Sequence, residues 1–241
     1  MRRLPEERML DILLERGEVT VRMMEELAER LAAFHALART GAGVDEHGSP
    51  AAVRANVEEN ALQTRSFAGR TLEAEDWELV RGASLRYLDR RRAVFDRRIA
   101  KGRIRDGHGD FHAANVCMTE PIAIFDCIEF NDRFRRGDVA AEVAFLATDL
   151  EYRGRADLPT VFVDRYVEVS RDCELRDVLD FYVCYRAYVR RKVESIKLDE
   201  PGFSPEECAT AMARARRYFD LARRYAIRLA STLDKTFSSV A

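Results

Sequence analysis

The sequence predicts a mainly helical protein with one small β ribbon. Apolar residues recur at helical spacing along most of the 241 residues. Between residues 102 and 131 the pattern changes to short apolar runs separated by turn residues, which is typical of strands and loops. Hydrophobic residues make up 47% of the chain, so a sizeable core can form around the helices.

The first hundred residues are expected to be helical. Pro5 suits the first turn of a helix that ends near Gly17, and Thr20 and Ser49 stand where the N-caps of later helices belong. The predicted helices span roughly 5–17, 21–37, a stretch from 50 onward, and 73–100. His35 lies on the apolar face of the second helix, so we expect it to be packed in the core.

The ribbon and the remaining helices follow. Segments 103–105, 116–118 and 122–125 have the pattern of strands, and the last two are joined by a turn at 119–121. Helices resume after Asp138, a favourable N-cap, and are also predicted at 158–171, 174–197 and 205–232. Ser204 and Glu207 are spaced as a capping box for the last helix.

Charge and cysteine usage exclude several classes of protein. The chain has 40 basic and 42 acidic residues and a net charge of -2, which argues against a dedicated nucleic-acid binder. Its five cysteines include no C-x-x-C pair, which favours reduced thiols in a cytoplasmic protein. No apolar run approaches the roughly 18 residues of a membrane span. We therefore expect a small-molecule partner, with no nucleic acid and no membrane.

The most informative segment is 108–115, which reads His-Gly-Asp-Phe-His-Ala-Ala-Asn, with Asp126 at the end of the next apolar run. Asp110 can accept a hydrogen bond from an attacking hydroxyl and later its proton. Asn115 offers a neutral oxygen and Asp126 a charged one, and such hard ligands suit Mg²⁺. Phosphoryl transfer from ATP needs mainly positioning and charge neutralisation, and the spacing of Asp110 and Asn115 is that of a kinase catalytic loop. The segment therefore predicts a site for ATP- and Mg²⁺-dependent phosphoryl transfer.

The wording of this segment, with Gly109 and His112, resembles the aminoglycoside phosphotransferase family of small-molecule kinases. Residues 124–132 and the triplet 136–138, Arg-Gly-Asp, strengthen the likeness to a bacterial branch that is often fused to a P-loop kinase domain. The resemblance covers most of the chain. It implies that a hydroxyl of a small molecule, which the sequence does not identify, accepts the phosphoryl group.

The resemblance also implies a role for each candidate residue. Asp110 would be the catalytic base or would orient the hydroxyl, and Asn115 and Asp126 would hold Mg²⁺. His112 would lie near the γ-phosphate of ATP. His108 and Asp138 would give structural support to the loop, with the Asp138 carboxylate tying the loop backbone in place.

The fold that the resemblance implies is the C-terminal, large lobe of a protein-kinase-like fold, formed by residues 1–241 as a single domain. The N-terminal nucleotide lobe would be absent, because no segment before residue 100 alternates like a sheet and no G-x-G-x-x-G is found. We therefore expect the chain to bind ATP poorly alone. An apolar surface left by the missing lobe would favour self-association.

Plainer structural roles remain open for these residues. Asp110 and Asn115 could cap a turn, and Asp126 could cap a strand end. His112 could pack within the loop instead of contacting a ligand, and Asp138 could be only a helix N-cap.

Two other functions also remain open. The chain could be a non-catalytic, pseudokinase-like binding module. It could also be a metal-dependent phosphoesterase, since segment 109–112 matches the opening of such sites. Those sites need further histidine ligands, and the chain has only four histidines.

Overall fold

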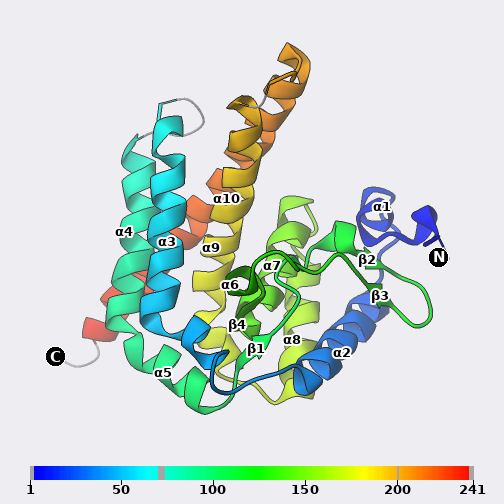
Figure 1. Ribbon diagram of the computed structural model, residues 1–241, viewed down its shortest axis with the longest axis horizontal. Coiled ribbons are helices and arrows are strands. Elements are labelled where there is room, and N and C mark those ends of the chain that lie inside the picture. The colour runs from blue at the N-terminus through cyan, green and yellow to red at the C-terminus, as the bar shows by residue number, and fades with distance from the viewer. Residues whose placement is uncertain (1–2, 70–73, 200, 239–241) are drawn as a thin grey trace. The chain divides into compact units, whose positions relative to one another are not determined.

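The computed structural model describes residues 3–69, 74–199 and 201–238. Most of them are helical, and the strands form two small antiparallel sheets, as Figure 1 shows. The predicted class, mainly helical with a small β ribbon, is therefore confirmed. None of the described helices is long and apolar enough to cross a bilayer.

The longer elements occur in the following order: α1 Leu10–Glu15, α2 Val21–Leu37, α3 Pro50–Thr64, α4 Ala74–Arg90, α5 Arg92–Ala100, β1 Ile104–Asp106, β2 Val116–Cys117, β3 Ala123–Ile124, α6 Asp132–Arg135, β4 Arg136–Asp138, α7 Val139–Tyr152, α8 Leu158–Ser170, α9 Leu175–Ile196 and α10 Pro205–Ser238.

The predicted helix caps are found where the sequence placed them. The side chain of Thr20 accepts a hydrogen bond from the Met23 amide, and the side chain of Ser49 accepts one from the Ala52 amide. Ser204 and Glu207 exchange the two hydrogen bonds of a capping box at the start of α10. These caps satisfy amides that the first turn of a helix leaves without intrahelical partners.

The single helix predicted over 73–100 is wrong. The chain forms α4 and α5 with a turn at Arg91, where the Val94 amide bonds to the Arg91 carbonyl three residues back. Three successive arginines at 90–92 provide no buried apolar residue there, so nothing in the core holds a continuous helix across the turn. Glu73, the predicted first residue, lies outside the described residues.

The chain divides into two compact units, and the first comprises Met1–Gly48 and Arg98–Leu179. Within it α8 packs against both α2 and α7. Every residue from Val139 to Leu150 in α7 is buried, including the acidic side chains of Glu142 and Asp149. A helix buried all round is a rigid support for the segments that contact it.

Two strand pairs in this unit frame the candidate loop. β1 pairs with β4, so that Ile104 faces Asp138, and β2 pairs with β3, so that Val116 faces Ile124. The predicted ribbon is thus confirmed, although β4 and the short helix α6 were not predicted. Because β4 runs directly into α7, the first sheet places the start of α7 beside β1 and the loop that follows β1.

The second unit comprises Ser49–Arg97 and Asp180–Ala241. In it α4 packs against α3 and α10. Its core includes an aromatic cluster in which the ring of Phe181 stacks on Tyr87, with centroids 5.6 Å apart, and meets Phe95 edge to face at 5.5 Å. Contacts of this geometry add to the stability gained from burying the rings.

Candidate active site

The loop 107–115 turns sharply at Gly109. Its φ is +84°, a value that side chains other than glycine rarely adopt. A Cβ atom at this position would lie 2.8 Å from the Phe134 carbonyl oxygen and 3.0 Å from the Arg135 Cα. Glycine is therefore required both by the backbone conformation and by the close approach of segment 134–135.

Asp110 and Asn115 are joined by their side chains. The Asn115 Nδ2 donates to the Asp110 carbonyl oxygen at 3.0 Å and to its Oδ2 at 3.3 Å. The Asp110 side chain is 36% exposed, so its carboxylate can be reached from solvent. Since the Asn115 nitrogen is committed to Asp110, its amide oxygen is the atom available to a cation.

His108 connects this pair to the segment that carries Asp126. Its Nε2 lies 2.8 Å from the Phe125 carbonyl oxygen, which can only accept, so this nitrogen carries the proton. Its Nδ1 is then the acceptor for the Asp110 amide at 3.3 Å. These two bonds join the loop to the segment before Asp126, and the supporting role of His108 stays a prediction.

Asp126 directly follows a residue that is bonded to Asn115. The Phe125 amide donates to the Asn115 carbonyl oxygen at 3.1 Å, and the Ile128 amide donates to the His108 carbonyl oxygen at 3.0 Å. These bonds bring Asp126 to the same loop as Asp110. Asp126 is exposed and has a φ of +61°, an uncommon conformation for a residue other than glycine.

His112 contacts Asp110 and is also packed. Its Nε2 lies 3.3 Å from the Asp110 Oδ2, and its ring centroid is 5.6 Å from that of Phe145 on α7. The imidazole is thus fixed beside the carboxylate that the sequence assigns to catalysis.

Glu142 of α7, which the sequence analysis did not single out, bonds to the backbone of the loop. Its Oε1 accepts from the amide of Gly109 at 2.7 Å and from the amide of His108. Its Oε2 lies 2.8 Å from His35 Nε2, and His35 Nδ1 lies 2.7 Å from the Tyr166 hydroxyl. His35 is buried, as predicted, and belongs to a polar chain that runs from α8 to the loop.

The pKa of Glu142 reflects these partners. Burial alone would raise the pKa of this carboxyl, but the hydrogen bond from His35, the charge of His35 and the Gly109 amide lower it below its usual value. The carboxylate is therefore ionised, which strengthens its bonds to the two loop amides.

Asp149 adds a second bond from α7 to the loop. Its Oδ2 accepts from the Ala113 amide at 3.0 Å. Asp149 and Glu142 are seven residues apart and so lie on one face of the helix. Two acidic residues at this spacing within the mostly apolar stretch 139–150 were the sequence signal that could have revealed them.

Asp138 has partners other than the loop backbone. Its carboxylate caps α7 by accepting from the Ala140 amide at 2.8 Å, and it pairs with the buried guanidinium of Arg98. Arg98 also donates to Asp172 at 2.9 and 3.0 Å. Burial alone would lower the pKa of Arg98, but the two carboxylates raise it. The loop amides take their carboxylate partners from Glu142 and Asp149, so the role expected of Asp138 falls to those residues.

The donor set at Asn115 and Asp126 fits Mg²⁺ that arrives with phosphate. Within the described part of the chain, no group of three or more His, Cys, Asp and Glu residues is arranged to hold a metal. Mg²⁺ does not need such a group, because it is usually bound by one or two protein oxygens together with phosphates and water. One amide oxygen and one exposed carboxylate meet that requirement.

A cavity of about 640 Å³ lies between α2 and the segments that flank the loop. Phe34 and Leu37 of α2 form part of its apolar wall, and they are 39% and 90% exposed. His108, Cys127 and Glu129 also line it. The cavity therefore borders the candidate loop at its start.

Comparisons with known proteins identify relatives. A model of the phosphotransferase enzyme family matches residues 1–182. Uncharacterized proteins of Mycobacterium tuberculosis and Mycobacterium bovis are 33% identical over 214 residues, which is 88% of this chain and 42% of theirs. The chain thus spans less than half the length of these relatives.

A solved structure, that of a Plasmodium vivax ethanolamine kinase, matches with 12% identity and a TM-score of 0.48. The match covers 83% of this chain and 59% of the kinase. At that level of likeness it carries no information about the substrate of this chain.

Proposed function

The chain belongs to the phosphotransferase enzyme family, and from that membership we propose that it carries the catalytic residues for ATP-dependent phosphorylation of a hydroxyl on a small molecule. The observation that carries the proposal is the bonded pair of Asp110 and Asn115, together with the bond from the Phe125 amide, next to Asp126, to the Asn115 carbonyl oxygen. Three oxygen-bearing side chains of the types that phosphoryl transfer requires thus lie on adjoining segments.

Asp110 would act on the acceptor. Its partly exposed carboxylate can accept a hydrogen bond from the hydroxyl, orient it, and take its proton as the bond to phosphorus forms. Its Oδ2 is steadied by Asn115 and His112. We infer that His112 acts through Asp110, whose carboxylate it contacts.

Asn115 and Asp126 would hold Mg²⁺ on the nucleotide. The ion would neutralise charge on the phosphates during transfer. The side-chain nitrogen of Asn115 is already bonded to Asp110, so the side-chain oxygen is the atom that would bind the ion. This arrangement couples the base and the metal ligand through a single side chain.

We also propose that the chain corresponds to the large lobe of a kinase-like fold and needs a complementary lobe for tight nucleotide binding. Three of its lysines are engaged elsewhere: Lys101 pairs with Glu174, Lys192 donates to Asn60 and Gln63, and Lys197 pairs with Glu194. The exposed side chains of Phe34 and Leu37 on α2 support this proposal, because an apolar surface of this kind could be covered by another lobe or a second copy.

Titration of Mn²⁺ in the presence of ATP, followed by electron paramagnetic resonance, tests the metal site. We expect weak binding by the chain, reduced at least about tenfold in Asp126→Asn, the size typical of losing one charged ligand contact. Asp132→Asn is the matched control, because Asp132 is a nearby half-exposed carboxylate that pairs with arginines. Equal losses in both variants, or no loss in Asp126→Asn, would contradict the assignment.

Phosphate transfer to alcohols tests the proposed reaction. With Mg-ATP in excess, Asp110→Asn should lower the rate about a hundredfold or more, as expected for loss of a general base. An unchanged rate would refute the role of Asp110.

Calorimetry with Mg-ATP tests the need for a complementary lobe, since tight binding of the nucleotide by this chain would refute it. A binding function that survives Asp110→Ala while no transfer is found would favour the non-catalytic alternative.

A further inference from the structure

Two phenylalanines lie exposed on the segment that follows Asp126. Phe130 is 83% exposed and Phe134 is 38% exposed. Their rings meet edge to face, with centroids 6.4 Å apart and an interplanar angle of 67°. Single apolar residues are common on protein surfaces, but a paired aromatic surface is typical of a binding site.

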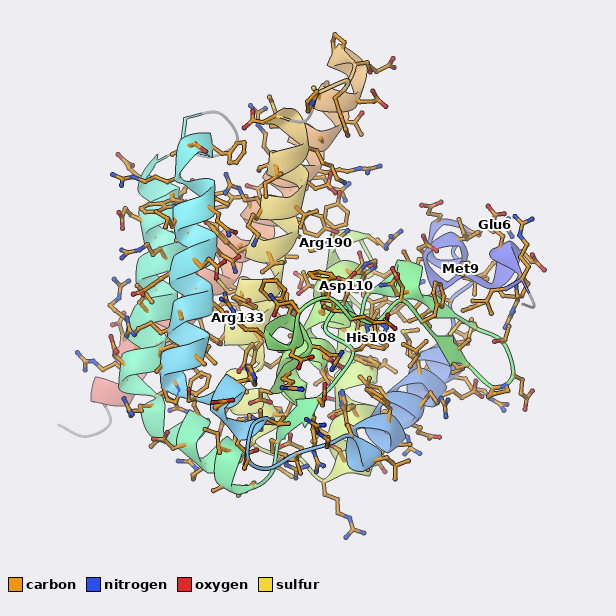
Figure 2. All side chains as sticks on the ribbon, viewed as in Figure 1. Glu6, Met9, His108, Asp110, Arg133 and Arg190 are labelled. Carbon is orange, nitrogen blue, oxygen red and sulfur yellow. The ribbon has the colours of Figure 1, made fainter. Side chains whose placement is uncertain are left out.

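This aromatic pair is attached directly to the candidate loop. A Cβ atom at Gly109, the residue before Asp110, would meet the Phe134 carbonyl oxygen and the Arg135 Cα. The Gly107 amide donates to the Arg135 carbonyl oxygen at 3.2 Å. In Figure 2 the labelled Arg133, the neighbour of Phe134, lies on α6 beside the loop that carries His108 and Asp110. The segment that carries the pair therefore adjoins the segment that carries Asp110.

The segment that carries the pair is held by several hydrogen bonds. Asn131 caps α6 by accepting from the Arg133 amide at 3.0 Å. Arg135 donates to the Ile128 carbonyl oxygen at 3.0 Å and to Asp106 at 2.6 Å. The guanidinium of Arg135 lowers the pKa of Asp106, with burial acting in the opposite direction. A surface fixed in this way loses little conformational entropy when a ligand binds.

The charge around the pair selects among aromatic ligands. The Arg133 guanidinium lies 5.3 Å from the centroid of the Phe134 ring, so a cation already uses the electron-rich face of that ring. The neighbouring carboxylate of Asp132 pairs with Arg135 at 2.9 Å and with Arg136 at 2.6 Å. These contacts disfavour an ammonium ligand at Phe134 and leave the exposed ring of Phe130 to neutral or anionic partners.

We propose that Phe130 and Phe134 form the acceptor-binding surface and select an alcohol that carries a planar aromatic ring, neutral or anionic. This inference rests on the proposed function, in which Asp110 orients the accepting hydroxyl. It adds the substrate class: the ring packs on the aromatic pair while the hydroxyl reaches the carboxylate of Asp110. Polycationic acceptors are disfavoured by Arg133.

Saturation-transfer NMR with four small alcohols tests the proposal on the full chain. The probes are benzyl alcohol, 4-(hydroxymethyl)benzoate, 4-(aminomethyl)benzyl alcohol and cyclohexylmethanol. We expect the first two to bind and the last two to bind several-fold more weakly. In the double variant Phe130→Leu/Phe134→Leu, which keeps the surface apolar, affinity for the aromatic probes should fall about tenfold. Phe203→Leu, at a phenylalanine of similar exposure to Phe134, is the control and should leave affinity unchanged.

The outcomes separate this inference from the proposed function. Asp110→Asn should keep aromatic binding and lose transfer. An unchanged transfer rate in this variant, with aromatic binding intact, would refute the role of Asp110 and leave the acceptor surface standing. Binding of cyclohexylmethanol equal to that of benzyl alcohol, tighter binding of the ammonium probe, or unchanged affinity in the double leucine variant would overturn the acceptor surface. Sedimentation tests whether a second copy of the chain covers the pair instead. A dimer of the unchanged chain that dissociates in Phe130→Ser, with no probe bound, would also overturn the acceptor surface.

Discussion

Replacement of Glu142 by alanine should loosen the candidate loop more than any exposed acidic substitution. The buried carboxylate accepts from the amides of His108 and Gly109 and bonds to His35. Truncation leaves these three groups buried without their shared partner, at a cost of about 1–3 kcal/mol for each such group. Allowing for relaxation, we expect a loss of about 3–5 kcal/mol in the free energy of unfolding. Glu142→Gln, which keeps an acceptor oxygen, should lose less.

Urea unfolding and amide hydrogen exchange together measure this effect. Exchange at Gly109 and His108 should speed up in Glu142→Ala under native conditions, because their amides lose their acceptor. Glu168→Ala, on the exposed surface of α8, is the control and should change stability by less than about 1 kcal/mol. A loss below about 1 kcal/mol in Glu142→Ala, or unchanged protection at Gly109, would refute the view that this residue holds the loop.

Three further predictions concern the same unit. Since the pKa of Glu142 is lowered on folding, its stabilising contribution should be present above its ordinary pKa of 4.5 and disappear as the pH falls through the lower folded value, so urea midpoints of the unchanged chain and Glu142→Gln should converge in acid. Arg98→Met leaves two carboxylates buried without their guanidinium and should lower the free energy of unfolding by about 3–5 kcal/mol, measured by urea unfolding. Gly109→Ala should lower the melting temperature more than Gly154→Ala, because both have φ near +84° but only Gly109 meets backbone atoms within 4 Å.

Local rules predicted the features of the fold that depend on neighbouring residues. The caps at Thr20, Ser49 and Ser204 were predicted because an N-cap needs only a short side chain near the next amides. The ribbon at 116–124 was predicted because two short apolar runs joined by turn residues specify a hairpin locally. The turn at Arg91 was missed, since the apolar pattern resumes on both sides of it.

Partners distant in sequence were beyond the reach of such rules. β4 pairs with β1 across about thirty residues, and a three-residue strand has too little pattern to be recognised. Glu142 lies in a mostly apolar helix. Its role depends on hydrogen bonds from the amides of residues 108 and 109, which only folding brings close to its carboxylate. Asp138 illustrates the same difficulty. The sequence pointed to a buried acid near the loop, but it did not show that the loop amides would bond to Glu142 and Asp149.

The bonds described above hold the candidate loop from within its own unit. Glu142 and Asp149 hold its amides from α7, His108 ties it to Phe125, and Arg98 fixes the start of α7 through Asp138. None of these contacts requires a nucleotide or a metal. Asp110 and Asn115 are therefore set in place before any ligand arrives, and ligand binding need not supply the free energy to order them. It follows that weak nucleotide binding by this chain would reflect missing phosphate contacts and not a disordered catalytic loop.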